Sequence, residues 1–253
     1  MKAKEVVAEM WSALMTNNDP SVIEKYVHPQ YKQHSPYVKN GTEGLKDLLA
    51  TLRPDYSYEP VRFIGDDSFV VMHGIHHNWL NNIMTGGEKV VGIDIFRVEN
   101  DQIAEHWDAS IPMAPASISG RSQLDGPTEI KNKELTERSK NIGEEYVENV
   151  LIGQKINELD KFVDADVLQH NPGIGDGITA LKEALEVDEK EYKRVHRVVA
   201  EGEFVALQSE GEIRGQIHTF WDILRIDTND KIVEQWQVVA VFPDVVAHSN
   251  GPF

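Results

Sequence analysis

The chain contains one long stretch of sequence twice. Gln33-His34-Ser35-Pro36 recurs 136 residues later as Gln169-His170-Asn171-Pro172. Further on, Ile103-Ala104-Glu105-His106-Trp107-Asp108 recurs 129 residues later as Ile232-Val233-Glu234-Gln235-Trp236-Gln237. Solenoid units are only about 20–50 residues long and occur in larger numbers, so a repeat of this length indicates a whole domain. We therefore expect two copies of one domain in the 253 residues.

Each copy has helical periodicity first and strand alternation afterwards. In copy one we expect helices over 4–17, 19–26 and 42–52, and strands over 56–64, 69–80, 90–99 and 103–109, with a turn over 81–87. In copy two we expect helices over 130–151, 156–163 and 177–185, and strands near Tyr192, Phe204, Ile217 and Ile232. Short turns favour antiparallel neighbours, which gives an α+β class with helices on one sheet face.

The segment between the copies is rich in Pro, Ser and Gly and is interpreted as a linker. The predicted boundaries are domain 1 over 1–110, a linker over 111–128 and domain 2 over 129–253.

Composition excludes several classes of protein. The chain has no cysteine, so disulfides and cysteine-ligated metals are ruled out. The net charge of −17 repels nucleic acid and anionic lipid. No apolar run is long enough for a membrane span, and no secretory signal is recognisable, so we expect a cytoplasmic protein.

The order of helices, Tyr31-Lys-Gln-His-Ser-Pro36, Gly41-Thr-Glu-Gly-Leu45 and the run from Asp94 to Asp108 resembles the SnoaL-like polyketide cyclases of the nuclear-transport-factor-2-like superfamily. The resemblance implies two tandem cone-shaped α+β barrels, each with N-terminal helices on a strongly curved antiparallel sheet. It also implies acid/base chemistry without metal or organic cofactor, with Asp108 and, less directly, His34 in that role. Because domains of this superfamily pair through their sheets, the fusion would form an intramolecular pseudo-dimer, with further oligomerisation possible.

Strand alternation supplies the other candidate catalytic residues. Asp94 shares a face with Phe96, and His106 shares one with Asp108. Adjoining strands could therefore aim His73, Asp94, His106 and Asp108 toward a common space, which His34 would enter from a loop. The sequence does not fix which face lines the cone, and ion pairs or turn hydrogen bonds would explain these residues equally well.

Copy two differs at the candidate positions. Gln208, Gln235 and Gln237 stand where copy one has His73, His106 and Asp108, and amides cannot exchange protons near pH 7. Copy two therefore looks incapable of acid/base work. Its candidates, taken as ligand-binding, are Gln208, Gln235, Gln237, His170 and Asp222, joined by Trp107 of copy one, although both repeated tryptophans also suit core packing.

The histidines His73, His76 and His77 do not favour a metal site, because His76 faces away from the other two on a regular strand.

The leading hypothesis is a cofactor-independent enzyme that acts on a small hydrophobic carbonyl compound by cyclisation, isomerisation or aldol-type chemistry. The alternatives are a non-catalytic protein that binds or senses a small molecule, and a structural pseudo-dimer.

Overall fold

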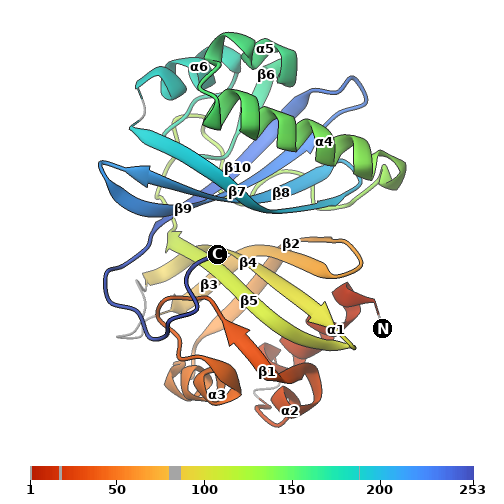
Figure 1. Ribbon diagram of the computed structural model, residues 1–253, viewed down its shortest axis with the longest axis vertical. Helices are drawn as coiled ribbons and strands as arrows, with labels where there is room; N and C mark the ends of the chain where they lie inside the picture. The colour runs from red at the N-terminus through yellow and green to blue at the C-terminus, as the bar shows by residue number, and fades with distance from the viewer. Residues whose placement is uncertain (1, 17–18, 80–86, 188) are drawn as a thin grey trace. The chain divides into compact units, whose positions relative to one another are not determined.

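The computed structural model describes residues 2–16, 19–79, 87–187 and 189–253 and divides into two compact units. Unit 1 comprises Met1–Pro112 and Phe242–Phe253, and unit 2 comprises Met113–Val241. The predicted α+β class is confirmed: each unit carries helices on a curved sheet that is five-stranded in the described part of the chain (Figure 1).

Unit 1 begins with three short helical segments. Helix α1 (Ala3–Trp11) continues into a π-helical turn, η1 (Ser12–Thr16), and α2 (Val22–Tyr26) and α3 (Gly41–Thr51) follow. Helix α1 forms because its apolar residues recur at helical spacing, and it buries Val6, Val7 and Met10. Gly41 precedes the body of α3 with φ +81°, which favours glycine, and its repeat counterpart Gly177 has φ +89°.

The sheet of unit 1 has the order β1-β5-β4-β3-β2. Its strands are β1 (Val27–Gln33), β2 (Ser57–Gly65), β3 (Phe69–Trp79), β4 (Gly87–Glu99) and β5 (Gln102–Pro112). The last four match the predicted strands and pair antiparallel. Strand β1 was not predicted, and it pairs parallel with β5 at the sheet edge. Most of the predicted turn, residues 81–86, lies outside the described residues.

Unit 2 repeats this plan. The long predicted helix is divided into η2 (Lys133–Leu135), α4 (Thr136–Tyr146) and a π-helical stretch, η3 (Val147–Ile152); then come η4 (Ile156–Glu158), α5 (Leu159–Phe162) and α6 (Ile178–Val187). Its strands, in the order β6-β10-β9-β8-β7, are β6 (Val163–Gln169), β7 (Lys190–Glu201), β8 (Phe204–Ile213), β9 (Gln216–Ile226) and β10 (Ile232–Val241). Figure 1 shows α4 lying across this sheet.

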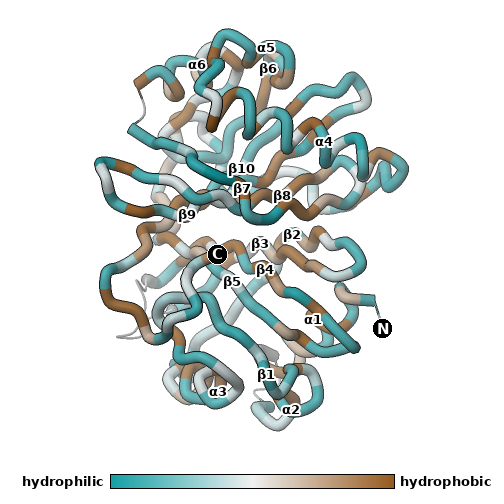
Figure 2. Tube along the Cα trace, viewed as in Figure 1, coloured by the Kyte–Doolittle hydropathy of each residue, from teal (hydrophilic) through white to brown (hydrophobic). Residues whose placement is uncertain are grey.

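Each unit has its own core between helices and sheet. In unit 1 the core joins Val6, Val7 and Met10 of α1 to Val70 and Met72 of β3. In unit 2 it joins helical residues such as Tyr146 and Val150 to Leu207 and Phe220 on the sheet. Figure 2 shows hydrophobic and hydrophilic residues alternating along α4, as expected of a helix with one buried face.

The units differ from the predicted boundaries at two segments. Residues 113–128, assigned to the linker, belong to the compact body of unit 2, and residues 242–253, assigned to domain 2, belong to that of unit 1. None of the described helices is long and apolar enough to cross a membrane.

Candidate active site

The register of three neighbouring strands in unit 1 determines which side chains share a face. Asp94 of β4 is paired with Met72 of β3 on one side and with Asp108 of β5 on the other. Side chains alternate along a strand, so Phe96 and His106, also a cross-strand pair, lie on the same face. This face packs against helix α1.

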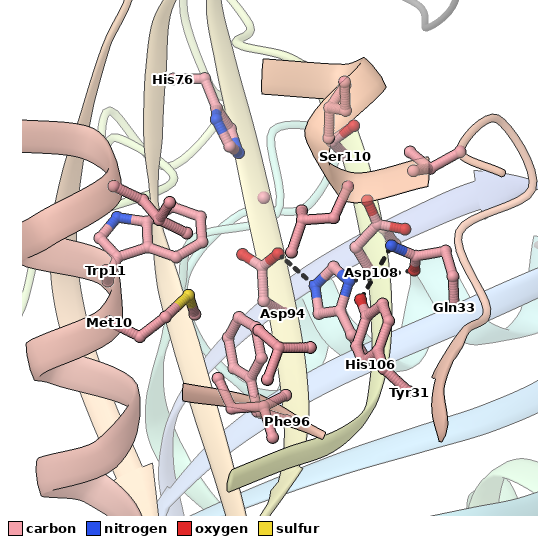
Figure 3. Close-up of a pocket in the computed structure, with 18 of the residues that line it drawn as sticks. Met10, Trp11, Tyr31, Gln33, His76, Asp94, Phe96, His106, Asp108 and Ser110 are labelled. Carbon is pink, nitrogen blue, oxygen red and sulfur yellow. Dashed lines mark hydrogen bonds and ion pairs between the residues drawn. The ribbon is translucent and has the colours of Figure 1, made fainter. Parts of the chain in front are cut away.

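An apolar cavity of about 60 Å³ lies between this face and the helices. Met10 and Trp11 of α1 border it, as Figure 3 shows, and Asp94, His106 and Asp108 supply its charged groups. The remaining lining residues are Leu14, Val27, Tyr31, Gln33, Val38, Leu45, Leu48, Tyr56, His76, Trp79, Gly92, Phe96, Ile103, Ala109 and Ser110.

The centre of the site is a hydrogen-bonded chain from Gln33 to His106 to Asp94 (Figure 3). Gln33 Oε1 accepts from the backbone N–H groups of His34 and Ser35 at 3.0 and 2.9 Å, which fixes it as an acceptor. His106 Nδ1, 3.1 Å away, must therefore carry a proton and donate it to Gln33. On the other side of the ring, Nε2 lies 2.9 Å from Asp94 Oδ1, so one further proton is shared between His106 and Asp94.

This arrangement favours the charged form of the imidazole. Burial lowers the pKa of His106, but the hydrogen bond and negative charge of Asp94 outweigh it and leave the pKa raised above its ordinary value. The second oxygen of the same carboxylate, Asp94 Oδ2, is buried and has no hydrogen-bond partner among the residues that the structure describes. A buried unpaired oxygen is costly, so it is a position where a ligand group would gain a hydrogen bond.

Asp108 is the cross-strand neighbour of Asp94 and also borders the cavity. Burial raises the pKa of Asp108 to about 6; the charge of His106 opposes the rise and that of Asp94 adds to it. A carboxyl group with this pKa changes its protonation state close to neutrality, which suits both removal and return of a proton.

Tyr31 adds a hydrogen-bond donor to the cavity. Its hydroxyl oxygen accepts from Gln33 Nε2 at 3.0 Å, so the hydroxyl proton is free to point elsewhere. Burial, together with the charges of Asp108 and Asp94, raises the pKa of Tyr31 well above its ordinary value, so the group stays protonated.

His76 and Tyr56 also border the cavity and were not among the candidate catalytic residues. His76 Nδ1 is 2.9 Å from the hydroxyl of Tyr56, and burial lowers the pKa of His76 to about 4, so this imidazole is neutral at pH 7. From the sequence, His76 is a candidate only for a metal ligand. His76 is four residues from Met72 on the same strand, so the two side chains share a sheet face. Because Met72 is paired with Asp94, that face is the one that borders the cavity.

The structure places three candidates of copy one, His34, His73 and Trp107, away from the cavity. His73 is on the opposite sheet face, where its Nδ1 lies 3.3 Å from Arg62 Nη1. His34 stacks on Trp107 with ring centroids 4.6 Å apart, and its Nε2 lies 3.2 Å from Glu105. The common space predicted for the candidates is thus occupied by Asp94, His106 and Asp108, without His34 and His73.

In unit 2 the corresponding carboxylate, Asp222, is fully satisfied. It accepts from Tyr192 at 3.0 Å, from Gln235 at 3.2 Å and from Gln237 at 2.8 Å. Burial raises the pKa of Asp222, against the lowering effect of these donors. Gln235 and Gln237 also border a cavity of about 280 Å³, together with Tyr146, whose buried hydroxyl has no hydrogen-bond partner in the described part of the chain.

The other candidates of copy two repeat the contacts made away from the cavity in unit 1. Gln208 accepts from Arg197 at 2.6 Å, as His73 contacts Arg62. His170 stacks on Trp236 at 4.6 Å and lies 2.8 Å from Glu234. A tryptophan–histidine stack and a histidine–glutamate pair recur in both units, which favours a role in holding the fold together. Among the described residues, no group of three or more His, Cys, Asp or Glu side chains is arranged to hold a metal ion.

Each unit is therefore an α+β cone whose sheet face and helices enclose a cavity. Residues 7–106, nearly all of unit 1 before its C-terminal segment, match the family described as the SnoaL-like domain. The first repeat is thus similar to the SnoaL-like domain over residues 7–106, and the second repeat has the same strand order.

Several solved structures are similar to part of the chain. A proposed ketosteroid isomerase from Kribbella flavida is 14% identical, with a TM-score of 0.39 over 46% of this chain and 86% of that one. A SnoaL-like polyketide cyclase from Agrobacterium tumefaciens is 13% identical, with a TM-score of 0.37 over 44% and 92%. An LEH-like epoxide hydrolase from Mycobacterium tuberculosis is 18% identical, with a TM-score of 0.34 over 41% and 84%. No curated protein matches the chain.

Proposed function

We propose that unit 1 is a cofactor-independent acid/base catalyst that moves a proton next to the carbonyl group of a small hydrophobic compound. The observation that carries the proposal is the meeting of Asp94, His106 and Asp108 at the wall of an otherwise apolar cavity. Charged groups in such surroundings interact strongly and titrate away from their ordinary values, as catalytic acids and bases must.

Asp108 is the proposed base. Above its pKa of about 6 the carboxylate takes a proton from the carbon beside the carbonyl. The electron pair of the broken C–H bond moves onto the carbonyl oxygen, which accepts a hydrogen bond from Tyr31. Asp108 then returns the proton to another carbon, which is isomerisation. In cyclisation or aldol addition the enolate carbon instead bonds to a second carbonyl carbon, the π electrons of that C=O move onto its oxygen, and this oxygen takes the proton from Asp108. The His106–Asp94 pair orients polar groups of the substrate through Asp94 Oδ2.

Exchange of carbon-bound hydrogen tests the first step without knowledge of the natural substrate. Small apolar ketones are incubated with the full chain in D₂O, and loss of the proton signal beside the carbonyl is followed by NMR. We expect exchange that Asp108→Asn abolishes and Tyr31→Phe slows, while Asp67→Asn, a change of an exposed aspartate, leaves the rate unaltered. Unchanged exchange in Asp108→Asn would reject the assignment.

A second candidate function belongs to unit 2, which we propose binds a small ligand without turning it over. Three features support binding without proton exchange: the larger cavity, the Tyr146 hydroxyl, which has no partner among the described residues, and the hydrogen-bonded carboxylate of Asp222. Saturation-transfer NMR with the same ketones should show binding to the Asp108→Asn chain that Tyr146→Phe weakens. Equal binding with and without the Tyr146 hydroxyl would remove this candidate.

A further inference from the structure

The segments that follow the last strand of each repeat are exchanged between the units. Residues 113–125 follow β5 of the first repeat but belong to unit 2, and residues 242–253 follow β10 of the second repeat but belong to unit 1. Neither placement is dictated by chain connectivity, since a segment leaving a strand can return to its own domain.

In unit 1 the C-terminal segment binds one short stretch of chain, residues 33–36. Ala247 N donates to Pro36 O at 2.8 Å, and His248 Nε2 donates to Ser35 O at 2.8 Å. The remaining contacts are His34 Nδ1 to Gly251 O at 2.9 Å and Asn250 Nδ2 to Gln33 O at 2.8 Å and to Asn40 Oδ1 at 2.7 Å. Several directed hydrogen bonds onto four consecutive residues hold that stretch in one conformation.

In unit 2, residues 113–125 make equivalent contacts, and each of their contact residues lies 129 positions before its counterpart in the C-terminal segment. Ile118 N donates to Pro172 O as Ala247 N does to Pro36 O, and Ser122 O accepts from His170 as Gly251 O does from His34. A third contact joins equivalent positions through different chemical groups. The hydrogen bond from Asn250 to Asn40 in unit 1 corresponds to an ion pair between Arg121 and Asp176 at 3.0 Å in unit 2. Both residues of the pair differ between the units and remain complementary, which indicates a contact that is maintained in each.

The stretch held in unit 1 contains the residue that sets the proton on His106. Gln33 receives the C-terminal segment through its backbone carbonyl, and its own N–H donates to Asn40, the other partner of Asn250. Its side chain is the acceptor that requires a proton on His106 Nδ1. The C-terminal segment is thus two hydrogen bonds away from the imidazole that pairs with Asp94.

We propose that residues 247–251 act as a latch that positions Gln33 and thereby fixes the protonation of His106, so that the site of unit 1 is complete only with the C-terminal segment docked. Asn250 is a positioning residue in this scheme. The consequence for catalysis rests on the proposed function, whereas the consequence for His106 does not.

Titration of His106 followed by ¹⁵N NMR in the full chain tests the latch. Gln33→Ala removes the acceptor, and we expect the pKa of His106 to fall by about one unit and its Nδ1–H form to lose its dominance. Asn250→Ala should shift both readouts in the same direction by a smaller amount. The double variant should match Gln33→Ala alone, because Asn250 acts through Gln33. Exchange of ketone protons should slow about tenfold in Asn250→Ala, the equivalent of one hydrogen bond.

Two control variants are used, one in the C-terminal segment and one in the equivalent segment of unit 2. Ser249→Ala alters an exposed side chain of the same segment, and Ser119→Ala removes the contact to Gln169 O in unit 2; both should leave the titration of His106 unchanged. A chain ending at Val246 should behave like Asn250→Ala, and if it fails to fold, Asn250→Ala decides alone.

An unchanged pKa and Nδ1–H population of His106 in Asn250→Ala would overturn the latch. A shifted titration in a chain without any ketone exchange would support the latch and reject the proposed catalysis. The two proposals therefore fail separately.

Discussion

The two units place an aspartate at the same position of the same fold but surround it differently. Asp94 of unit 1 has a histidine on one oxygen and, among the described residues, no hydrogen-bond partner on the other; a second carboxyl group lies beside it. Asp222 of unit 2 is bonded by a tyrosine and two glutamines. Both units keep a buried aspartate at this position, so the difference lies in its partners: a histidine in unit 1, and a tyrosine with two glutamines in unit 2.

Contacts on the opposite face are shared by both units. The stacks of His34 on Trp107 and of His170 on Trp236 have nearly the same geometry, at 4.6 Å with interplanar angles of 15° and 13°. What both units keep therefore belongs to the architecture, and what only unit 1 has belongs to its proposed chemistry.

The largest expected effect is on ketone proton exchange in Asp108→Asn. Loss of a general base costs about 10²–10⁴-fold in rate, and we expect about 10³-fold here. The asparagine has the same shape but cannot take a proton, so binding of the ketone should be much less affected than the rate. Rates measured by NMR in D₂O at pD 8 check this, and a fall of less than tenfold would contradict it.

The histidine–glutamate pairs distinguish the units by burial. The side chains of His170 and Glu234 are 0% and 2% exposed, against 7% and 18% for His34 and Glu105. Glu234→Gln should therefore lower the free energy of unfolding by about 3 kcal/mol, and Glu105→Gln by about 1 kcal/mol. Hydrogen exchange measured separately on β10 and β5 gives both values, and equal losses would refute the comparison.

We expect acid to lower the stability of unit 2 through protonation of Glu234. Burial raises the pKa of Glu234, but hydrogen bonds from His170 and Arg225 outweigh it and hold the pKa below its ordinary value. The stabilisation is present above the ordinary pKa and lost as pH falls through the folded-state value. Glu234→Gln should remove this acid-sensitive part of the unfolding curve.

Asp108 should have the opposite effect on the pH dependence of stability: its ionisation at high pH should destabilise unit 1. Its pKa is raised from 3.8 to about 6, so the ionised group destabilises the fold at pH 7 and above, and the penalty disappears as pH falls below 4. At about 1.4 kcal/mol per unit, Asp108→Asn should stabilise unit 1 by up to ~3 kcal/mol at pH 8 and by little at pH 3.5. Urea unfolding at both pH values measures the difference, and a gain that does not depend on pH would speak against a strained carboxylate.

The smallest effect concerns Tyr192, one of the donors to Asp222. Tyr192→Phe leaves the carboxylate with two donors, and we expect a loss of about 1–2 kcal/mol in the stability of unit 2. Ketone exchange should not change. Hydrogen exchange on β9 reports the loss, and a slower ketone reaction in this variant would show that unit 2 takes part in the chemistry.

Much of this architecture was predictable because the repeat and the strand alternation are local in sequence. Strand β1 was missed because Val27–Gln33 is short, contains Pro29 and pairs parallel with a strand far along the chain. Its counterpart β6 contains no proline but is equally short and has the same parallel pairing with the distant strand β10.

The site was predicted only in part, because alternation groups residues within a strand but does not align one strand with the next. His73 and His76 lie on opposite faces in any register, and only the pairing of Met72 with Asp94 shows that His76 borders the cavity. The docking of 242–253 in unit 1 has no local signal, since it depends on hydrogen bonds between residues more than two hundred positions apart.

A ¹³C NMR titration of the Asp108 carboxyl group, assigned by its absence in Asp108→Asn, measures the property on which the proposed chemistry depends. We expect a midpoint near pH 6, accompanied by a response of the His106 ring. A midpoint near 3.8, the ordinary value for an aspartate, would show that the cavity does not hold a proton carrier for neutral pH.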